Sequence, residues 1–409
     1  MPVGPGPSRY SSPMPASSRR RALLLICATA IASATNYTNH GPVLGFIRGE
    51  FGLSSADAGA IATAFFAGAA STMLGGGAIA DRIGTRPAVT LGFLLMVIGN
   101  LGTGLLAPTF PALLAWRVLG GLGSGFGFAA GASYTRSIFD DRGRHLAQGL
   151  YGASFLLGSG ITLAYIPILA GPAGDWRLAF TLSGLGVAAV WVIWTLLAPS
   201  EPRTPAVHSA RAALAVALRE RNTWLLALCH MCGFGMAIVV GTWVTLYLVD
   251  AFALPIAAAG LVGSLTLVTG IAARTVGGII LEGGIRPVRL IRSGLALAAL
   301  GLTTIALAPA LPVAIVGLVA TGMGVGLPYA AVFNGAAAST PASPASAQAL
   351  VGVGGLLSAI FGPPLVGTLL DATGDFAAGF LALAVIVVAV LALTSLIRPF
   401  NLSPTALEA

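Results

Sequence analysis

Long apolar stretches follow one another along this chain of 409 residues. About 20 apolar residues cross the hydrocarbon core of a bilayer as one helix. Only 8% of the residues are charged, whereas soluble domains carry about 25%. The chain therefore lacks the charge to cover a water-facing surface, which excludes a soluble enzyme, a nucleic-acid-binding protein and a disordered chain. Twelve spanning helices are predicted, at 22–47, 56–80, 87–107, 109–138, 146–170, 176–198, 223–249, 256–281, 288–307, 311–338, 347–371 and 376–397.

The positions of the arginines predict how these helices are oriented. All 21 basic residues are arginines, and 17 of them lie in cytoplasmic segments when the N-terminus is placed in the cytoplasm. Outer loops then hold only Arg48 and Arg177, while Arg117 and Arg274 lie within spans. Cytoplasmic loops of membrane proteins carry an excess of arginine and lysine. We therefore expect both termini in the cytoplasm and, from the arginine- and alanine-rich composition, a bacterial inner membrane.

The connections between the stretches are short, with one polar exception that contains Pro199, Pro202 and Pro205. This exception separates two groups of six helices. The expected organisation is a disordered cytoplasmic N-terminus at 1–21, a six-helix bundle at 22–198, a cytoplasmic linker at 199–222, a second six-helix bundle at 223–398 and a cytoplasmic tail at 399–409.

Three short motifs recur in both groups at an offset of 200 or 201 residues. The pairs are Ala147-Gln148-Gly149-Leu150 with Ala347-Gln348-Ala349-Leu350, Gly77-x-x-x-Asp81 with Gly278-x-x-x-Glu282, and Gly121-x-Gly123-x-Gly125 with Gly322-x-Gly324-x-Gly326. Each pair occupies the same helix of its own half. The chain is therefore predicted to contain a duplicated six-helix unit, and parallel repeats of this kind are a transporter architecture.

The residues from Gly77 to Arg86, Gly-Ala-Ile-Ala-Asp-Arg-Ile-Gly-Thr-Arg, resemble the loop 2–3 signature of the major facilitator superfamily. The segment Gly278–Arg286 looks like its degenerate second copy, and Arg117-x-x-x-Gly121-x-Gly123 is similar to the fourth-helix pattern of the same superfamily. The resemblance covers residues 20–400. It implies an all-α fold of twelve transmembrane helices in two pseudo-symmetric six-helix bundles. It also implies a cytoplasmic gating element made by Gly77, Asp81, Arg82, Gly84, Arg86, Arg136 and Glu282.

Within the superfamily, the segment from Asn36 to Pro42 looks most like the nitrate/nitrite and cyanate porter-like branch. Nitrate porters of that branch carry one arginine in helix 2 and another in helix 8. Arg274, eight residues before Glu282, fits the second position. Met73, eight residues before Asp81, stands at the first, so this chain departs from the nitrate pattern there.

Arg274 is the sharpest candidate for a binding residue. A charged side chain at mid-membrane costs at least about 2.5 kcal/mol, and arginine cannot lose its charge. If Arg274 faces a cavity, its planar guanidinium can donate two parallel hydrogen bonds to the oxygens of a carboxylate, nitrate or phosphate. Alternatively it reaches the cytoplasmic water along its own helix. Arg117 has three alternatives. It contacts the substrate, it reaches the outer water, or it positions neighbouring helices.

Asn36, Asn39 and His40 share one face of the first helix at spacings of three and four. They either line the substrate path or hold helices together by hydrogen bonds. His230, in helix 7, either moves a proton near neutral pH or bonds a neighbouring helix. Further candidates for a mostly apolar pocket with a few polar groups are Tyr151, Trp243, Tyr329 and Asn334.

These patterns favour a secondary transporter in which one small solute, expected to be an anion, binds at the midplane and the halves rock around it. No spanning segment has a central carboxylate, and no phosphate-binding Walker loop is present. We expect no cofactor, metal site or enzymatic activity, a monomer in the bilayer, and protons as one possible coupling ion. The alternatives are an exporter of amphipathic compounds in the same architecture, and a membrane sensor that has kept the fold.

Overall fold

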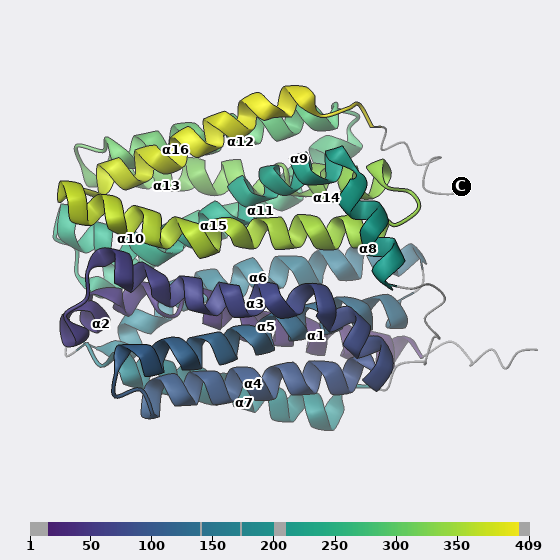
Figure 1. The fold of residues 1–409 in the computed structure, drawn as a ribbon, viewed down its shortest axis with the longest axis horizontal. Coiled ribbons are helices and arrows are strands. Elements are labelled where there is room, and N and C mark those ends of the chain that lie inside the picture. The colour runs from purple at the N-terminus through teal and green to yellow at the C-terminus, as the bar shows by residue number, and fades with distance from the viewer. Residues whose placement is uncertain (1–14, 140, 172–173, 200–209, 401–409) are drawn as a thin grey trace, which may run out of the picture.

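The computed structural model describes residues 15–139, 141–171, 174–199 and 210–400, with the backbone alone at 16, 77, 78, 81, 136, 141–146 and 211. Within these ranges the chain is helical and contains no β-strand. Figure 1 shows long helices running alongside one another in two groups, one formed by α1–α7 and the other by α9–α16.

The first group begins with α1, whose direction is continued by a short 3-10 segment and α2. Ser54, Thr109 and Asp175 each accept a hydrogen bond from a backbone N–H of the first turn that follows, which fixes where three of the helices begin. The elements are α1 (Ala16–Thr38), η1 (Gly41–Val43), α2 (Leu44–Phe51), α3 (Ser55–Ile83), α4 (Thr85–Leu105), α5 (Phe110–Ile138), α6 (Asp141–Ala170) and α7 (Trp176–Leu197).

The second group follows a short helix, α8 (Ala210–Arg219), in the connection between the groups. Two of its spans are interrupted: one by a π-helical segment and one by a break at Leu327 and Pro328. The elements are α9 (Arg221–His230), η2 (Met231–Gly235), α10 (Met236–Phe252), α11 (Ile256–Glu282), α12 (Pro287–Ala306), α13 (Leu311–Gly326), α14 (Tyr329–Ser339), α15 (Pro344–Thr373), α16 (Phe376–Leu393) and η3 (Thr394–Leu396).

Among the described residues, 11 helices are long and apolar enough to cross a membrane, and they correspond to the second to twelfth predicted spans. The first predicted span, 22–47, is divided: α1 ends at Thr38, and the remainder forms η1 and the start of α2. The sequence of α1 is less apolar than the others because it begins with Arg19, Arg20 and Arg21 and ends with Asn36. The predicted fold class, an all-α polytopic membrane protein, is confirmed.

The ends and the linker differ in detail from the expectation. Residues 16–21, expected to be disordered, belong to α1, because arginine is a good helix former and Pro15 precedes the first turn. The connection expected to be a polar linker holds α8, whose residues 213–218 are mostly apolar. Residues 1–14, 200–209 and 401–409, on which other parts of these predictions fall, lie outside the described residues.

The repeated glycines perform the same packing in both groups. A Cβ on Gly121 would collide with the Phe65 carbonyl of α3, and one on Gly123 would lie 2.5 Å from the Gly92 carbonyl of α4. In the second group the equivalent glycines face the equivalent helices: Gly322 contacts α11 and Gly324 contacts α12. Small residues let membrane helices approach this closely. The duplication read in the sequence is therefore a duplication of helix packing.

The two groups meet along α3 with α15 and along α6 with α11. The closest approach again uses glycine, since a Cβ on Gly59 would lie 2.6 Å from the carbonyl carbon of Pro363. Nearby, Thr63 Oγ1 donates a hydrogen bond of 2.6 Å to the Ile360 carbonyl. Binding residues on the inner faces of these four helices would therefore lie between the halves.

Candidate functional site

The side chain of Arg117 on α5 is buried, with 2% of its surface exposed. It lies against the end of α1, where Nη1 donates 3.1 Å to Asn39 Oδ1 and Nη2 donates 2.8 Å to the Asn36 carbonyl. Nη2 also lies 3.5 Å from His40 Nδ1. Arg117 therefore reaches inward to α1 and not outward to water, which removes one of the alternatives weighed above.

Asn100 on α4 completes this arrangement. It donates to Asn36 Oδ1 and to the Met96 carbonyl, and it accepts 3.1 Å from Asn39 Nδ2. We call Asn36, Asn39, His40, Asn100 and Arg117 the Arg117 cluster; each member is at most 2% exposed. The cluster joins α1, α4 and α5, so these polar side chains hold helices together by hydrogen bonds.

Two further contacts enclose the Arg117 cluster. The guanidinium carbon lies 4.5 Å from the Phe65 ring centroid and 5.4 Å from that of Phe180, within cation–π range. On the side of the other half, His40 Nε2 lies 3.3 Å from Thr242 Oγ1. Both terminal nitrogens of Arg117 are thus bonded inside the protein, and its Nε is buried without a hydrogen-bond partner.

Arg274 on α11 lies in a different environment. Its guanidinium carbon is 3.9 Å from the Tyr329 ring centroid, and Nη1 is 3.4 Å from the Gly152 carbonyl across the interface between the halves. Its Nε, like that of Arg117, is buried without a hydrogen-bond partner, but its Nη2 makes no hydrogen bond to any described residue. In the described part of the chain no carboxylate forms an ion pair with Arg274, and its side chain is partly exposed. It therefore keeps donors that a bound anion could use.

The Tyr329 ring that covers Arg274 packs against further rings of the same half. The rings of Tyr329 and Phe333 lie 4.7 Å apart, and His230 lies 4.8 Å from Phe333 and 6.0 Å from Tyr329. We call Gly152, His230, Arg274, Tyr329 and Phe333 the Arg274 site. Three of the residues predicted from the sequence, His230, Arg274 and Tyr329, are brought together there.

Both interruptions in the second group flank the Arg274 site. The π-helical segment Met231–Gly235 begins directly after His230, and the break at Leu327 and Pro328 directly precedes Tyr329. Single π-turns inside α-helices occur frequently at functional sites. Here they lie next to His230 and Tyr329, of which Tyr329 contacts Arg274 directly.

A chain of aromatic rings connects the Arg274 site to the first half. His230 stacks on Phe234 at 6.0 Å, and Phe234 lies 6.1 Å from Tyr37 of α1. From Tyr37 the chain continues to Phe155 at 5.7 Å and from there to Tyr151 at 5.3 Å. The predicted candidate Tyr151 therefore takes part through ring contacts, while its hydroxyl donates to the Phe128 carbonyl.

Two sequence-predicted candidates join neither group. Trp243 is fully buried inside the second half, where Nε1 donates 3.1 Å to the Pro363 carbonyl and the ring packs on Phe376. Asn334 is exposed on α14, the helix that also carries Tyr329. We leave both out of the site.

The predicted gating motif is described in part. Gly84 separates α3 from α4 with φ of 95°, a conformation that favours glycine. Arg86 Nη2 donates 2.7 Å to the Thr195 carbonyl, whereas Arg82 and Glu282 are exposed. Gly77 lies within α3, and the side chains of Asp81 and Arg136 lie outside the described residues.

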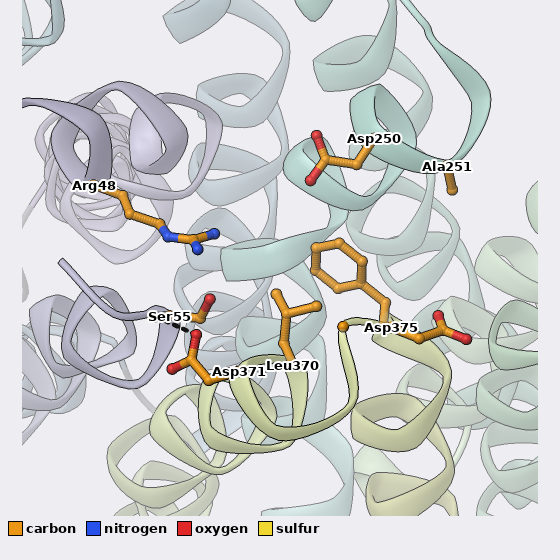
Figure 2. Close-up of a pocket in the computed structure, with 9 residues that line it drawn as sticks. Arg48, Ser55, Asp250, Ala251, Leu370, Asp371 and Asp375 are labelled. Atoms are coloured by element: carbon orange, nitrogen blue, oxygen red, sulfur yellow. Dashed lines mark hydrogen bonds between the residues drawn. The ribbon is translucent and has the colours of Figure 1, made fainter. Parts of the chain in front are cut away.

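A pocket of about 440 Å³ opens between the halves at the opposite end of α3 (Figure 2). Asp371, at the end of α15, accepts 2.8 Å from the Ser55 backbone N–H and 2.9 Å from that of Ala56. A carboxylate of one half therefore caps the positive end of a helix of the other half. Arg48 and Asp250 line the same pocket from α2 and α10.

Sequence reasoning did not single out Asn100, Thr242 or Asp371. Asn100 could have been found, because it is an amide inside an otherwise apolar span and such residues seek partners. The Asp371 contact joins residues more than 300 positions apart and depends on how the halves meet. Nothing in the local sequence marks it.

The chain is similar in sequence to several known proteins. A relative from Thermus thermophilus, a probable nitrate/nitrite antiporter, is 27% identical over 351 residues, which is 78% of each chain. A probable sulfoacetate transporter of Cupriavidus necator is 26% identical over 64% of this chain and 65% of its own length. A multidrug resistance protein of Escherichia coli is 32% identical over 35% of this chain and 36% of its own.

Solved structures with the same fold are transporters as well. A bacterial homologue of the human lysosomal transporter Spinster, in an inward-facing and occupied conformation, superposes with a TM-score of 0.80 at 18% identity, covering 96% of this chain and all of its own. A D-xylose-proton symporter gives 0.78 at 15% identity, covering 93% of this chain and 98% of its own. The sequence model of the Major Facilitator Superfamily matches residues 26–346, and the chain therefore belongs to that family.

Proposed function

We propose that this protein is a secondary transporter that carries a small anion across the bacterial inner membrane by alternating access, with Arg274 as the anion-binding residue. One observation carries the proposal: Arg274 stands between the halves with unused N–H donors and with no ion pair in the described part of the chain. A relative that is a probable nitrate/nitrite antiporter and another that is a probable sulfoacetate transporter support an anionic substrate.

The chemistry of Arg274 explains why an anion is favoured. A permanent positive charge among apolar helices is costly, and an anion at hydrogen-bond distance offsets that cost. The planar guanidinium can donate two parallel bonds to a carboxylate, nitrate or sulfonate group. Tyr329 covers one face of the guanidinium at 3.9 Å and so leaves the edge with the N–H groups for the ligand.

Alternating access requires contacts between the halves that can break. The bonds from Ser55 and Ala56 to Asp371 and the bond from Thr63 to Ile360 hold α3 against α15 on one side of the bilayer. With both termini in the cytoplasm, this is the outer side. We propose that these contacts break when the halves rock and that the anion then enters or leaves on this same side.

The test is counterflow of radiolabelled anions in proteoliposomes. Arg274→Ala should lower exchange at least about 30-fold, since removing one partner of a charge pair costs 2–5 kcal/mol. Arg289→Ala is the matched control, because Arg289 is exposed at the start of α12 and should leave exchange unchanged. Exchange of every anion at the wild-type rate in Arg274→Ala would overturn the proposal.

A second candidate function is export of amphipathic compounds. It is favoured by the aromatic rings that cross from His230 to Tyr151 and by the partial match to a multidrug resistance protein. Drug sensitivity of a deletion strain, unchanged by anion supply, together with no anion exchange in proteoliposomes, would favour export. His230 is our candidate for a proton-carrying residue in either case, and a pH gradient that drives wild-type but not His230→Gln uptake would support it.

A further inference from the structure

The internal repeat places Met73 at the position in the first half that Arg274 holds in the second. The offset of 201 residues that relates Gly121 to Gly322 also relates Met73 to Arg274, and their helices, α3 and α11, are equivalent. Both side chains lie on the inner faces of the halves, and both are partly exposed. Two positions that are equivalent in the repeat therefore face the interface between the halves, one with an apolar side chain and one with a charged side chain.

The contacts of these two side chains are equivalent as well. Arg274 Nη1 reaches the carbonyl of Gly152 on α6 of the other half. Met73 Cε reaches α15 of the other half, where it lies 2.9 Å from the place that a Cβ on Gly352 would take. Gly152 and Gly352 are themselves 200 residues apart in the repeat. One position therefore offers a guanidinium to the interface and the other offers a thioether.

The surroundings of Arg274 suit an apolar group better than a small hydrated ion. The rings of Tyr329, Phe333, His230 and Phe234 lie next to one another on the Arg274 side, and Phe234 meets Tyr37 across the interface. Aromatic faces are negative and cannot replace the water that a small inorganic ion loses on all its sides. They gain free energy when they cover an apolar body.

We propose that the substrate is an amphipathic monocarboxylate: one carboxylate group on an apolar, preferably flat, body. The carboxylate binds Arg274, and the body lies along the rings and extends toward the side of Met73. This proposal rests on the proposed function and narrows it. An inorganic anion such as nitrate would have only one cation to bind and no use for the apolar surroundings.

The proposal is tested with purified protein in nanodiscs, by competition with a radiolabelled monocarboxylate, benzoate. The panel contains benzoate, phenylacetate, acetate and nitrate, with benzylamine as a cation of the same shape. Benzoate or phenylacetate should bind at least roughly ten-fold more tightly than acetate and nitrate, and benzylamine should not compete. Arg274→Ala should lose binding of every anion.

Variants at Met73 separate this proposal from the broader one. Met73→Leu keeps an apolar side chain and should keep the preference for benzoate. Met73→Arg adds a second cation and should weaken benzoate while strengthening nitrate, by about ten-fold each. Thermal unfolding of each variant confirms that it is folded.

Three results would contradict the proposed substrate, and one of them would also contradict the proposed function. If acetate and nitrate bind as tightly as benzoate and binding still needs Arg274, the substrate class is wrong while the proposed function stands. If Met73→Arg leaves the preference unchanged, Met73 does not face the substrate and the proposal is overturned. If no anion binds to the folded wild-type protein, both proposals fail together.

Discussion

Arg117 and Arg274 both lie well inside membrane spans, and their surroundings differ. Arg117 is enclosed by one half, with an asparagine side chain, a backbone carbonyl and two aromatic rings around it. Arg274 lies between the halves with one long hydrogen bond and one supporting ring. In both residues Nε is unpartnered, so the difference lies in the terminal nitrogens. Those of Arg117 are both bonded within the protein, whereas Nη2 of Arg274 has no described partner and is available to a ligand.

The largest effect is expected from a side chain added where α5 packs closely against α3, next to Arg117. Gly121→Val should lower the free energy of unfolding by more than about 3 kcal/mol, because the added side chain meets the Phe65 carbonyl of α3 and backbone cannot yield as a side chain can. The neighbouring Gly120→Ala is the control, since its Cβ would sit 3.7 Å from the nearest atom, the Phe65 ring. Thermal unfolding in detergent measures both, and equal effects would refute this packing role.

A smaller loss of stability is expected from removing the arginine itself. Arg117→Leu leaves the acceptors on Asn36 and Asn39 buried without their donor, which should cost about 2–4 kcal/mol. Arg274→Leu should change stability by less than about 1 kcal/mol, because it removes one long hydrogen bond and a buried Nε without a partner. Equal losses in the two variants would erase the distinction between a structural arginine and a binding one.

The contact of Asp371 with α3, which we propose to lie at the outer end, tests whether the halves move as proposed. Asp371→Asn removes the charge that caps α3 and should shift the ratio of outer-closed to outer-open protein by about two- to five-fold. Asp375→Asn is the control, because Asp375 caps α16 within its own half. Spin labels at Gly49 and Ala372 report the separation of the halves, and no difference between the variants would contradict the role of Asp371.

The smallest effect concerns an exposed ion pair within the first half. Hydrogen bonds from Arg177, at 2.6 Å, and Trp176, at 2.7 Å, lower the pKa of Glu50 below its usual value of 4.5. Because the pKa is lowered in the folded protein, the stabilisation is present above about pH 4.5 and is lost as the pH falls through the folded value. Glu50→Gln should cost about 0.5 kcal/mol at pH 7 and progressively less as the pH is lowered from 4.5 toward 3. A constant difference across that range would show that protonation is not involved.

The sequence predicted the features that depend on composition and order. The lengths of the apolar stretches predicted where the spans lie. The repeated glycines predicted that the two halves pack alike, as the contacts of Gly121 and Gly322 show. Arg274, His230 and Tyr329 were predicted as candidates, because charged and polar groups are rare in spans. Their meeting takes place beside a π-helical segment and a helix break, neither of which was predicted from the sequence.

The role of Arg117 could not be separated from that of Arg274 by sequence alone. Both are arginines about seven or eight residues from a predicted helix end. What distinguishes them is the partner set, and Asn100 enters it from another helix 61 residues away from Asn39. The contact of Asp371 with the start of α3 is still harder to predict from the sequence, because it forms only when the two halves meet in one arrangement.

The most direct test measures anion binding and thermal unfolding together on the two alanine variants, Arg117→Ala and Arg274→Ala, in nanodiscs. We predict that Arg274→Ala unfolds near the wild-type temperature and binds no anion. We predict that Arg117→Ala unfolds at a lower temperature while its folded fraction binds with wild-type affinity. A folded Arg274→Ala that binds anions as the wild type does would contradict the central claim, as would a stable Arg117→Ala that has lost binding.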